Sequence, residues 1–172
     1  MTKRMLTLSL LLLLAVGLMA APLQAKPASS GLDADVLREL AQVRRATAQY
    51  QDVTAAVDAG YVPASPCVEA EGLGGMGVHY AKPYIFEPPT LEAPHPPLDI
   101  AEPELLVYAP GPDESLQLVA VEYASWTPAE LLGQTFDPPS PEGGPPFHTL
   151  HAWVWKANPS GMFAPFNPNV SC

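Results

Sequence analysis

Two histidines and one glutamate are the residues of this sequence whose types suit metal chemistry best. His79 follows a glycine-rich stretch, Glu122 interrupts an apolar run, and His151 stands beside tryptophans. Two imidazoles and a carboxylate are a familiar donor set for iron, manganese, copper or zinc. The three residues fall in separate predicted strands. The sequence therefore leaves three outcomes open: a divalent transition-metal site, a hydrogen-bonded polar cluster, or no convergence.

Aromatic residues beside these donors are expected to wall a ligand site. The predicted final strand, residues 147–156, alternates between two faces, and its two tryptophans share the face of His151. Two tyrosines directly follow the other two donors, where they would assist proton transfer if the site is catalytic. The four aromatic residues are Trp153, Trp155, Tyr80 and Tyr123.

Other polar motifs indicate chemistry less strongly. His148 lies three residues before His151, and odd spacing on a regular strand directs two side chains to opposite faces. His95 lies among prolines and is expected to be a solvated loop residue. The glycine-rich stretch Gly72–Gly77 has neither the lysine nor the following helix of a phosphate-binding loop. Because no Gly-x-Ser-x-Gly motif occurs either, we expect neither a nucleotide site nor a serine hydrolase.

The first 25 residues have the pattern of a secretory signal peptide. Lys3 and Arg4 precede an apolar run from Leu6 to Ala20, and small residues around Ala25 suit cleavage. The apolar run is short for a membrane span, which needs roughly 20 residues. The sequence therefore predicts a secreted or periplasmic protein whose mature chain, residues 26–172, is a single domain with no membrane attachment after cleavage.

The two cysteines, Cys67 and Cys172, are expected to form a disulfide bond in an oxidising compartment. The bridge would close a loop of about 100 residues, worth about 4–5 kcal/mol in the chain-entropy account. Free thiols that bind a metal are the alternative, although neither cysteine has neighbours at zinc-ligand spacing.

The chain is strongly acidic, with 8 basic and 18 acidic residues and a formal net charge of −10. Loss of Lys3 and Arg4 would leave 6 basic residues against 18 acids, or about −12. Such a charge repels phosphate backbones and anionic lipid headgroups. Nucleic acid is therefore excluded as a partner, whereas a metal ion or small ligand is compatible with the composition.

Apolar residues recur at spacings of three and four from Val36 to Val57, which predicts a helical segment with one apolar face. Ser30 or Asp33 can cap its start, Asp52 can cap a second short helix, and Gly60 suits the left-handed position after the end. A further one- to two-turn helix is predicted at 127–133, where Thr-Pro-Ala-Glu forms a capping box.

Extended runs at 78–81, 105–109, 116–125 and 147–156 predict strands, and the second and third form a hairpin. Proline-rich loops are predicted near 83–103 and 138–146, since prolines disrupt both helices and central strands. The predicted fold is α+β, with the N-terminal helical segment packed on an antiparallel sheet of about four or five strands. A cupin-like β-barrel or sandwich is the alternative.

Several motifs resemble a family of exported bacterial proteins that has no assigned activity. They are Gly75-Met76-Gly77-Val78-His79-Tyr80, Val121-Glu122-Tyr123, Leu150-His151-Ala152-Trp153, Asn158-Pro159-Ser160-Gly161-Met162-Phe163 and the final Cys172. The resemblance implies export and a single domain but no reaction. For function we expect an exported domain that binds a metal ion or small ligand through the His/Glu cluster. A metal-dependent enzyme and a purely structural envelope protein are the alternatives.

Overall fold

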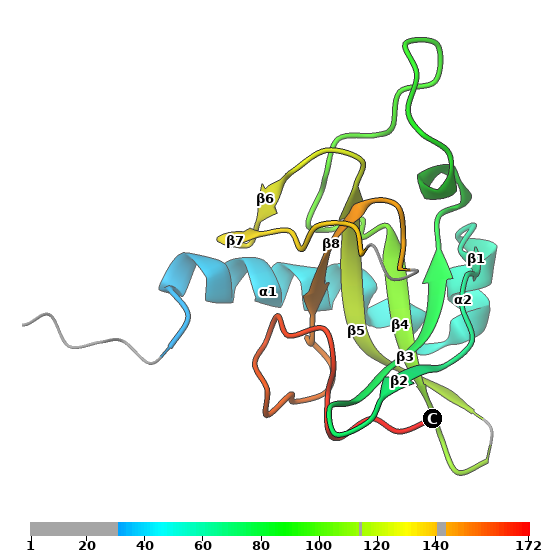
Figure 1. Cartoon of the computed structure of the whole chain (residues 1–172). Helices are drawn as coiled ribbons and strands as arrows, with labels where there is room; N and C mark the ends of the chain where they lie inside the picture. Colours follow the sequence, from blue (N-terminus) through cyan, green and yellow to red (C-terminus); the bar gives the residue numbers. More distant parts are fainter. Residues whose placement is uncertain (1–30, 114, 141–143) are drawn as a thin grey trace, which may run out of the picture. The chain divides into compact units, whose positions relative to one another are not determined.

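Alternating β-branched and aromatic residues build a six-stranded antiparallel sheet (Figure 1). The computed structural model describes residues 31–113, 115–140 and 144–172, so the signal peptide predicted for residues 1–25 lies outside the described part. The strands of the sheet are β1 (Val62–Pro63), β2 (Val68–Ala70), β3 (Gly74–Ala81), β4 (Leu105–Pro110), β5 (Leu116–Ser125) and β8 (His148–Ala152).

The strand order is β1-β3-β4-β5-β8, and β2 also pairs with β3. Each pairing is antiparallel. The sheet does not close into a barrel, which confirms the α+β prediction over the cupin-like alternative. The β4–β5 pair is the predicted hairpin, and it places these strands in the middle of the sheet.

Three consecutive helices precede the sheet: α1 (Ala34–Thr47), the 3-10 helix η1 (Ala48–Gln51) and α2 (Val53–Asp58). Asp33 precedes α1, and the side chain of Asp52 accepts a hydrogen bond from the Thr54 amide at the start of α2. Gly60 has φ of 87° after α2. The sequence therefore predicted where both helices start and the residue that ends the segment, although the Asp33 side chain makes no capping hydrogen bond to α1.

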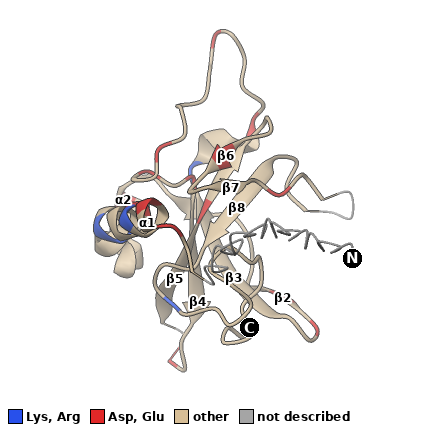
Figure 2. Cartoon of the chain, turned by 90° about the vertical axis from the view of Figure 1, so that its left-hand side faces the viewer, with Lys and Arg blue, Asp and Glu red and all other residues tan. Residues whose placement is uncertain are grey.

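One face of the sheet packs against α1 and α2 (Figure 2). Leu40 and Val43 of α1 are buried there against Leu106, Val121 and Leu150 of the sheet. The opposite face holds smaller clusters, which the C-terminal segment, residues near 147 and Ile85 of a short 3-10 helix cover. The sheet thus has two distinct faces, and residues next to each other on a strand lie on different ones.

The helix predicted at 127–133 is wrong. Here the chain forms a hairpin of β6 (Glu130–Leu131) and β7 (Gln134–Thr135), turned through Leu132 and Gly133, which have φ of 53° and 67°. Leu132 is buried in the same cluster as α1, as is Phe136. The capping box is only a local preference, and burial of these two apolar side chains outweighs it.

The proline-rich stretch begins with the 3-10 helix η2 (Pro83–Phe86) and continues to residue 104 without another helix or strand, and all its residues are described. It forms the long excursion at the top of Figure 1. The second predicted loop, 138–146, lies partly outside the described residues. No helix in the described part of the chain is long and apolar enough to cross a membrane.

Cys67 and Cys172 form the expected disulfide bond, with Cα atoms 5.6 Å apart. The C-terminal segment also pairs with β3, where the Gly75 amide donates to the Val170 carbonyl at 2.8 Å. The last residues of the chain are therefore fixed beside β2 and β3, next to the strand that carries His79.

Candidate metal centre

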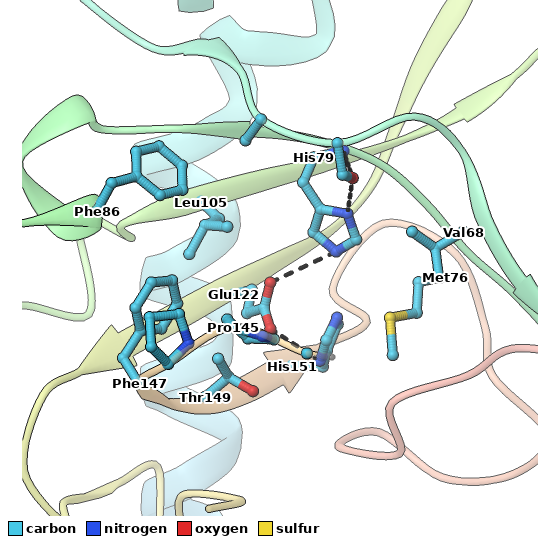
Figure 3. Close-up of a pocket in the computed structure, with 14 residues that line it drawn as sticks. Val68, Met76, His79, Phe86, Leu105, Glu122, Pro145, Phe147, Thr149 and His151 are labelled. Carbon is cyan, nitrogen blue, oxygen red and sulfur yellow. Dashed lines mark hydrogen bonds and ion pairs between the residues drawn. The ribbon is translucent and has the colours of Figure 1, made fainter. Parts of the chain in front are cut away.

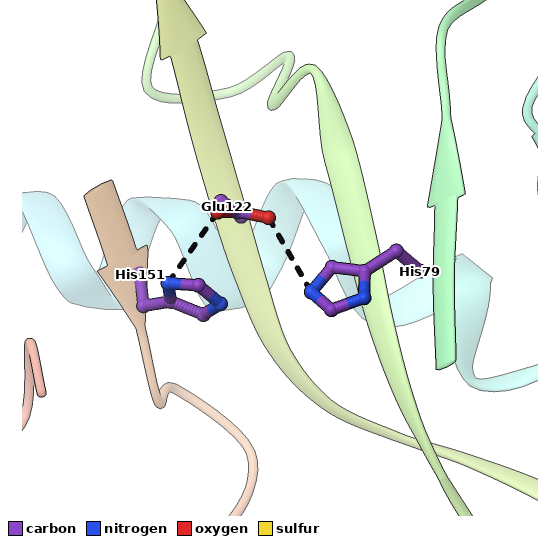
Figure 4. Close-up of side chains that lie close together, drawn as sticks. All are labelled: His79, Glu122 and His151. Carbon is purple, nitrogen blue, oxygen red and sulfur yellow. Dashed lines mark ion pairs between the residues drawn. The ribbon is translucent and has the colours of Figure 1, made fainter. Parts of the chain in front are cut away.

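His79, Glu122 and His151 converge on the sheet face opposite α1 (Figure 4). Glu122 on β5 pairs directly with His151 on β8. His79 lies on β3, and β4 separates this strand from β5. On β4, Val107 pairs with His79 and Leu105 pairs with Glu122. One ligand atom from each of the three side chains lies within 4.8 Å of the other two. The sheet register therefore brings together three donors that are far apart in the sequence.

The separations within this triad are longer than good hydrogen bonds. His79 Nε2 lies 3.5 Å from Glu122 Oε2, and His151 Nδ1 lies 3.5 Å from Glu122 Oε1. A charge-assisted N–H···O bond is typically about 2.7–2.9 Å. The three groups point toward one another without being in direct hydrogen-bond contact, which leaves space between their donor atoms.

Each imidazole has a defined orientation. Ser65 Oγ lies 2.8 Å from His79 Nδ1, so the other ring nitrogen of His79 faces Glu122. Nδ1 of His151 faces Glu122, and its Nε2 is buried with no hydrogen-bond partner among the described residues. A buried ring nitrogen without a partner is costly unless it meets a ligand or ion.

Burial makes the charged form of each group unfavourable. It raises the pKa of the Glu122 carboxyl, while His79 and a hydrogen bond from the Thr149 side chain act to lower it. Burial lowers the pKa of His79, against the effect of Glu122, and lowers the pKa of His151 to about 4. Both imidazoles are therefore neutral at pH 7, which is the form that binds metal ions.

Gly77 explains how β3 presents two side chains, Met76 and His79, to this face despite their odd spacing. The register between β2 and β3 shifts between Val68 and Glu69, opposite Gly77 and Gly75. Gly77 has φ of 115°, and a Cβ there would lie 2.5 Å from the Tyr108 carbonyl oxygen. Only glycine suits this close approach, and the resulting bulge re-aims the strand toward the site.

The triad lies in a cavity of about 450 Å³, with its polar groups close together and apolar side chains around them (Figure 3). The polar lining consists of the triad, Ser65 and Thr149. The remaining lining residues are Ala64, Val68, Met76, Phe86, Leu105, Gly144, Pro145, Pro146 and Phe147. Such a volume with few convergent polar groups is typical of a small-molecule site.

The predicted aromatic wall is not present as expected. Trp153 does stack near His151, with ring centroids 6.4 Å apart, and its indole donates to the Ala164 carbonyl. The other three, Tyr80, Tyr123 and Trp155, contact the helix-side core. None of the four aromatic residues is among the described residues that line the cavity.

Strand alternation explains two of the three misplaced aromatic residues, and the end of β8 explains the third. Tyr80 and Tyr123 follow His79 and Glu122 directly, so they point to the opposite face. Trp155 lies beyond the end of β8, and its indole donates to Thr47 Oγ1 of α1 at 3.1 Å. Proton transfer by either tyrosine at the triad is therefore ruled out by position.

The two remaining histidines lie outside the triad. His148 pairs with Ser125 in a regular stretch of β8, so it faces away from His151, as the odd spacing predicted. His95 lies in the proline-rich excursion, with its ring 5.2 Å from that of Tyr84. His95 is half-buried there, not fully solvated as expected.

Several site residues were not identified from the sequence. Thr149 could have been found, because it lies two residues before His151 on the same strand face. Ser65 and Phe86 carry no local indication, since only the folded chain brings their loops to β3 and β8.

The assembled site has the donors of a metal centre, an apolar cavity beside them and no complete catalytic set among its described lining residues. Neutral imidazoles and a carboxylate bind divalent transition metals and leave coordination positions open for another ligand. Comparisons with known proteins gave no match: no family model, no curated protein and no solved structure matches the chain.

Proposed function

We propose that this protein is an exported domain that binds one divalent transition-metal ion through His79, Glu122 and His151. The observation that carries the proposal is the convergence of three buried donors within 4.8 Å, all facing one cavity. Buried histidines and a buried glutamate are costly unless each is paired. A cation between them would pair with the Glu122 carboxylate, with Nε2 of His79 and with Nδ1 of His151 at once.

The donor spacings support an ion over a purely hydrogen-bonded cluster. Donors bonded at roughly 2.1 Å to one tetrahedral ion lie about 3.4 Å apart, and neighbouring octahedral donors about 3.0 Å apart. The two N···O separations of 3.5 Å, each to a different oxygen of Glu122, are close to the tetrahedral value. The donor atoms of all three residues lie within 4.8 Å of one another, so side-chain rotations would bring them to bonding distance of one ion.

Groups around the triad support the same assignment. Ser65 is hydrogen-bonded to the far nitrogen of His79, as outer partners of metal-bound imidazoles commonly are. Thr149 acts in the same way on Glu122, whose charged form its hydroxyl stabilises. These contacts orient the donors before an ion arrives and reduce the cost of ordering them.

The compartment is part of the proposal. The bridge between Cys67 and Cys172 fits an oxidising environment outside the cytoplasm. The apolar run that precedes Ala25 and the resemblance to exported proteins support the same location.

A metal-dependent enzyme on the same site is the second candidate, favoured by the cavity that opens onto the donors. A bound ion would supply Lewis-acid chemistry, and the chain itself would bind and orient the ligand. Since Tyr80 and Tyr123 point away, the hydroxyl groups among the described lining residues are those of Thr149 and Ser65. Turnover of a ligand, measured once a ligand is known, separates catalysis from binding.

The decisive experiment is a metal titration of mature protein stripped by a chelator. We expect calorimetry and elemental analysis with Zn²⁺, Mn²⁺ and anaerobic Fe²⁺ to give one ion per chain for at least one metal. His79→Ala and His151→Ala should each lower the affinity at least 100-fold, whereas His95→Ala, a loop histidine outside the triad, should not change it. Folded protein that takes up no metal would contradict the proposal and leave a hydrogen-bonded cluster with a structural role.

A further inference from the structure

We propose that the cavity beside the triad binds small organic monoacids with an apolar tail, their carboxylate on the metal ion. This inference rests on the metal-binding function proposed above and specifies the class of ligand. It follows from two properties of the cavity: the charge of its polar end and the composition of its walls.

With a divalent ion bound, the polar end of the cavity would carry a net positive charge, which favours a ligand with one negative charge. A divalent ion with Glu122 and two neutral imidazoles leaves a net charge of +1 in a buried site. An ion in a low-dielectric environment is stabilised by a neutralising partner. A carboxylate supplies that charge and also donates oxygen to the coordination positions that three protein ligands leave open.

A second negative charge would have no partner. No lysine or arginine is among the described residues that line the cavity. Three of the five cations among the described residues, Arg38, Arg44 and Arg45, lie on α1, against the opposite face of the sheet (Figure 2). Of the other two, Lys82 donates to the Ala59 carbonyl, and neither Lys82 nor Lys156 lines the cavity. Dicarboxylates, phosphates and sulfates are therefore poor ligands for this cavity.

The walls favour a hydrocarbon tail over a sugar or a peptide. Away from the triad the lining is apolar, and Phe86 and Phe147 lie side by side there with ring centroids 6.4 Å apart. Few hydrogen-bond partners remain for ligand hydroxyls or amides, whose burial without partners is costly. Phe86 is 43% exposed, which places it at the rim where a tail enters.

The test uses mature protein whose Zn²⁺ content is measured first. This protein is then titrated by calorimetry with acetate, butyrate and hexanoate in a carboxylate-free buffer. Each buried methylene should raise the affinity about fourfold. Hexanol, which lacks the charge, should bind at least tenfold more weakly than hexanoate. Metal-free protein should bind hexanoate at least tenfold more weakly as well.

Variants separate the wall from the metal. Phe86→Ala should weaken hexanoate binding about tenfold and leave the Zn²⁺ content unchanged, because Phe86 does not contact the triad. Leu91→Ala provides the matched control, since Leu91 is an apolar residue 97% exposed in the proline-rich excursion and outside the cavity lining. Its affinity for hexanoate should equal that of the parent.

The outcomes are distinct. Protein that holds Zn²⁺ but binds the three acids equally, or binds hexanoate equally well without the metal, overturns this inference and leaves the metal-binding function standing. Protein that holds no metal overturns both. An effect of Leu91→Ala equal to that of Phe86→Ala also counts against the assigned cavity.

Discussion

At the scale of single residues, Glu122 determines the chemistry of the cluster. It is 5% exposed, and burial raises its pKa although His79 acts to lower it. Burial lowers the pKa of both imidazoles, those of His79 and His151, so neither is protonated at pH 7. Protons therefore compete with a metal ion at the carboxylate as the pH falls toward the raised pKa of Glu122.

Metal affinity should consequently fall in weakly acidic solution through Glu122. A raised folded-state pKa means that the carboxyl gains its proton above pH 4.5, the ordinary value, as the pH falls. We expect Zn²⁺ affinity to be lower at pH 5 than at pH 7, with proton release on metal binding that grows as the pH falls. Calorimetry in two buffers of different ionisation enthalpy measures the protons released. Affinity and proton release that both stay constant from pH 7 to pH 5 would count against Glu122 as a ligand with a raised pKa.

A second buried carboxyl, Glu104, should make stability depend on pH. Burial raises its pKa to about 7, although the Ala124 amide and the Tyr84 hydroxyl donate to it. Because the folded-state pKa is raised, the group favours folding below about pH 4.5, and this contribution is lost as the pH rises through about 7. The loss is about 1–3 kcal/mol.

Glu104→Gln should remove that pH dependence. Urea denaturation at pH 5 and pH 8 should give a difference between the two pH values that is smaller in the variant than in the parent. Glu92→Gln, on the exposed part of the proline-rich excursion, is the control and should behave as the parent does. Equal pH dependence in the parent and Glu104→Gln would mean that Glu104 ionises normally.

At the scale of elements, α1 is the support behind the sheet that carries the donors. Leu40 is 5% exposed within its apolar stripe, and Leu37 on the same helix is 53% exposed. We expect Leu40→Ala to lower the free energy of unfolding by about 2–5 kcal/mol, because it leaves a cavity in the core. Leu37→Ala should lower it by less than about 1 kcal/mol, and urea titration of both variants checks the contrast.

The longer helices and strands could be predicted because their patterns are local. The helical stripe through Leu40, the cap at Asp52 and the alternation of the final strand each depend on neighbouring residues. The hairpin at Leu132 could not be predicted, because its conformation depends on burial against distant parts of the core. The candidate triad could be named from residue types, but the convergence of His79 with Glu122 depends on the order of β3, β4 and β5.

At the scale of the whole molecule, the disulfide bond joins residues 105 positions apart. In the chain-entropy account such a bridge contributes about 4–5 kcal/mol. Replacing both cysteines, Cys67→Ser with Cys172→Ser, should lower the stability by about 2–5 kcal/mol in urea denaturation.

Intact mass of exported protein should show two hydrogens fewer than the reduced form and the loss of roughly the first 25 residues. Two alkylatable thiols in the native protein would exclude the bridge in solution.

The acidic surface should affect how fast the proposed acids arrive. A formal net charge of −10 repels anions at long range, and salt screens that repulsion within about 10 Å at 0.1 M. Association of hexanoate with the Zn²⁺ protein should therefore accelerate as NaCl rises from 10 to 200 mM. Stopped-flow kinetics measures this rate, and hexanol, which carries no charge, serves as the control. A rate that slows with salt would indicate a local cationic path to the cavity.

The position of the three donors on three different strands has a thermodynamic consequence. An unfolded chain does not hold His79, Glu122 and His151 together, so it lacks the chelating geometry of the folded sheet. By mass action, an ion that binds the folded form alone stabilises it, by about 2.7 kcal/mol when free metal is 100 times the Kd. Metal supply would then set how often β3 and β8 separate from the central strands, and hence how readily a protease cleaves the protein.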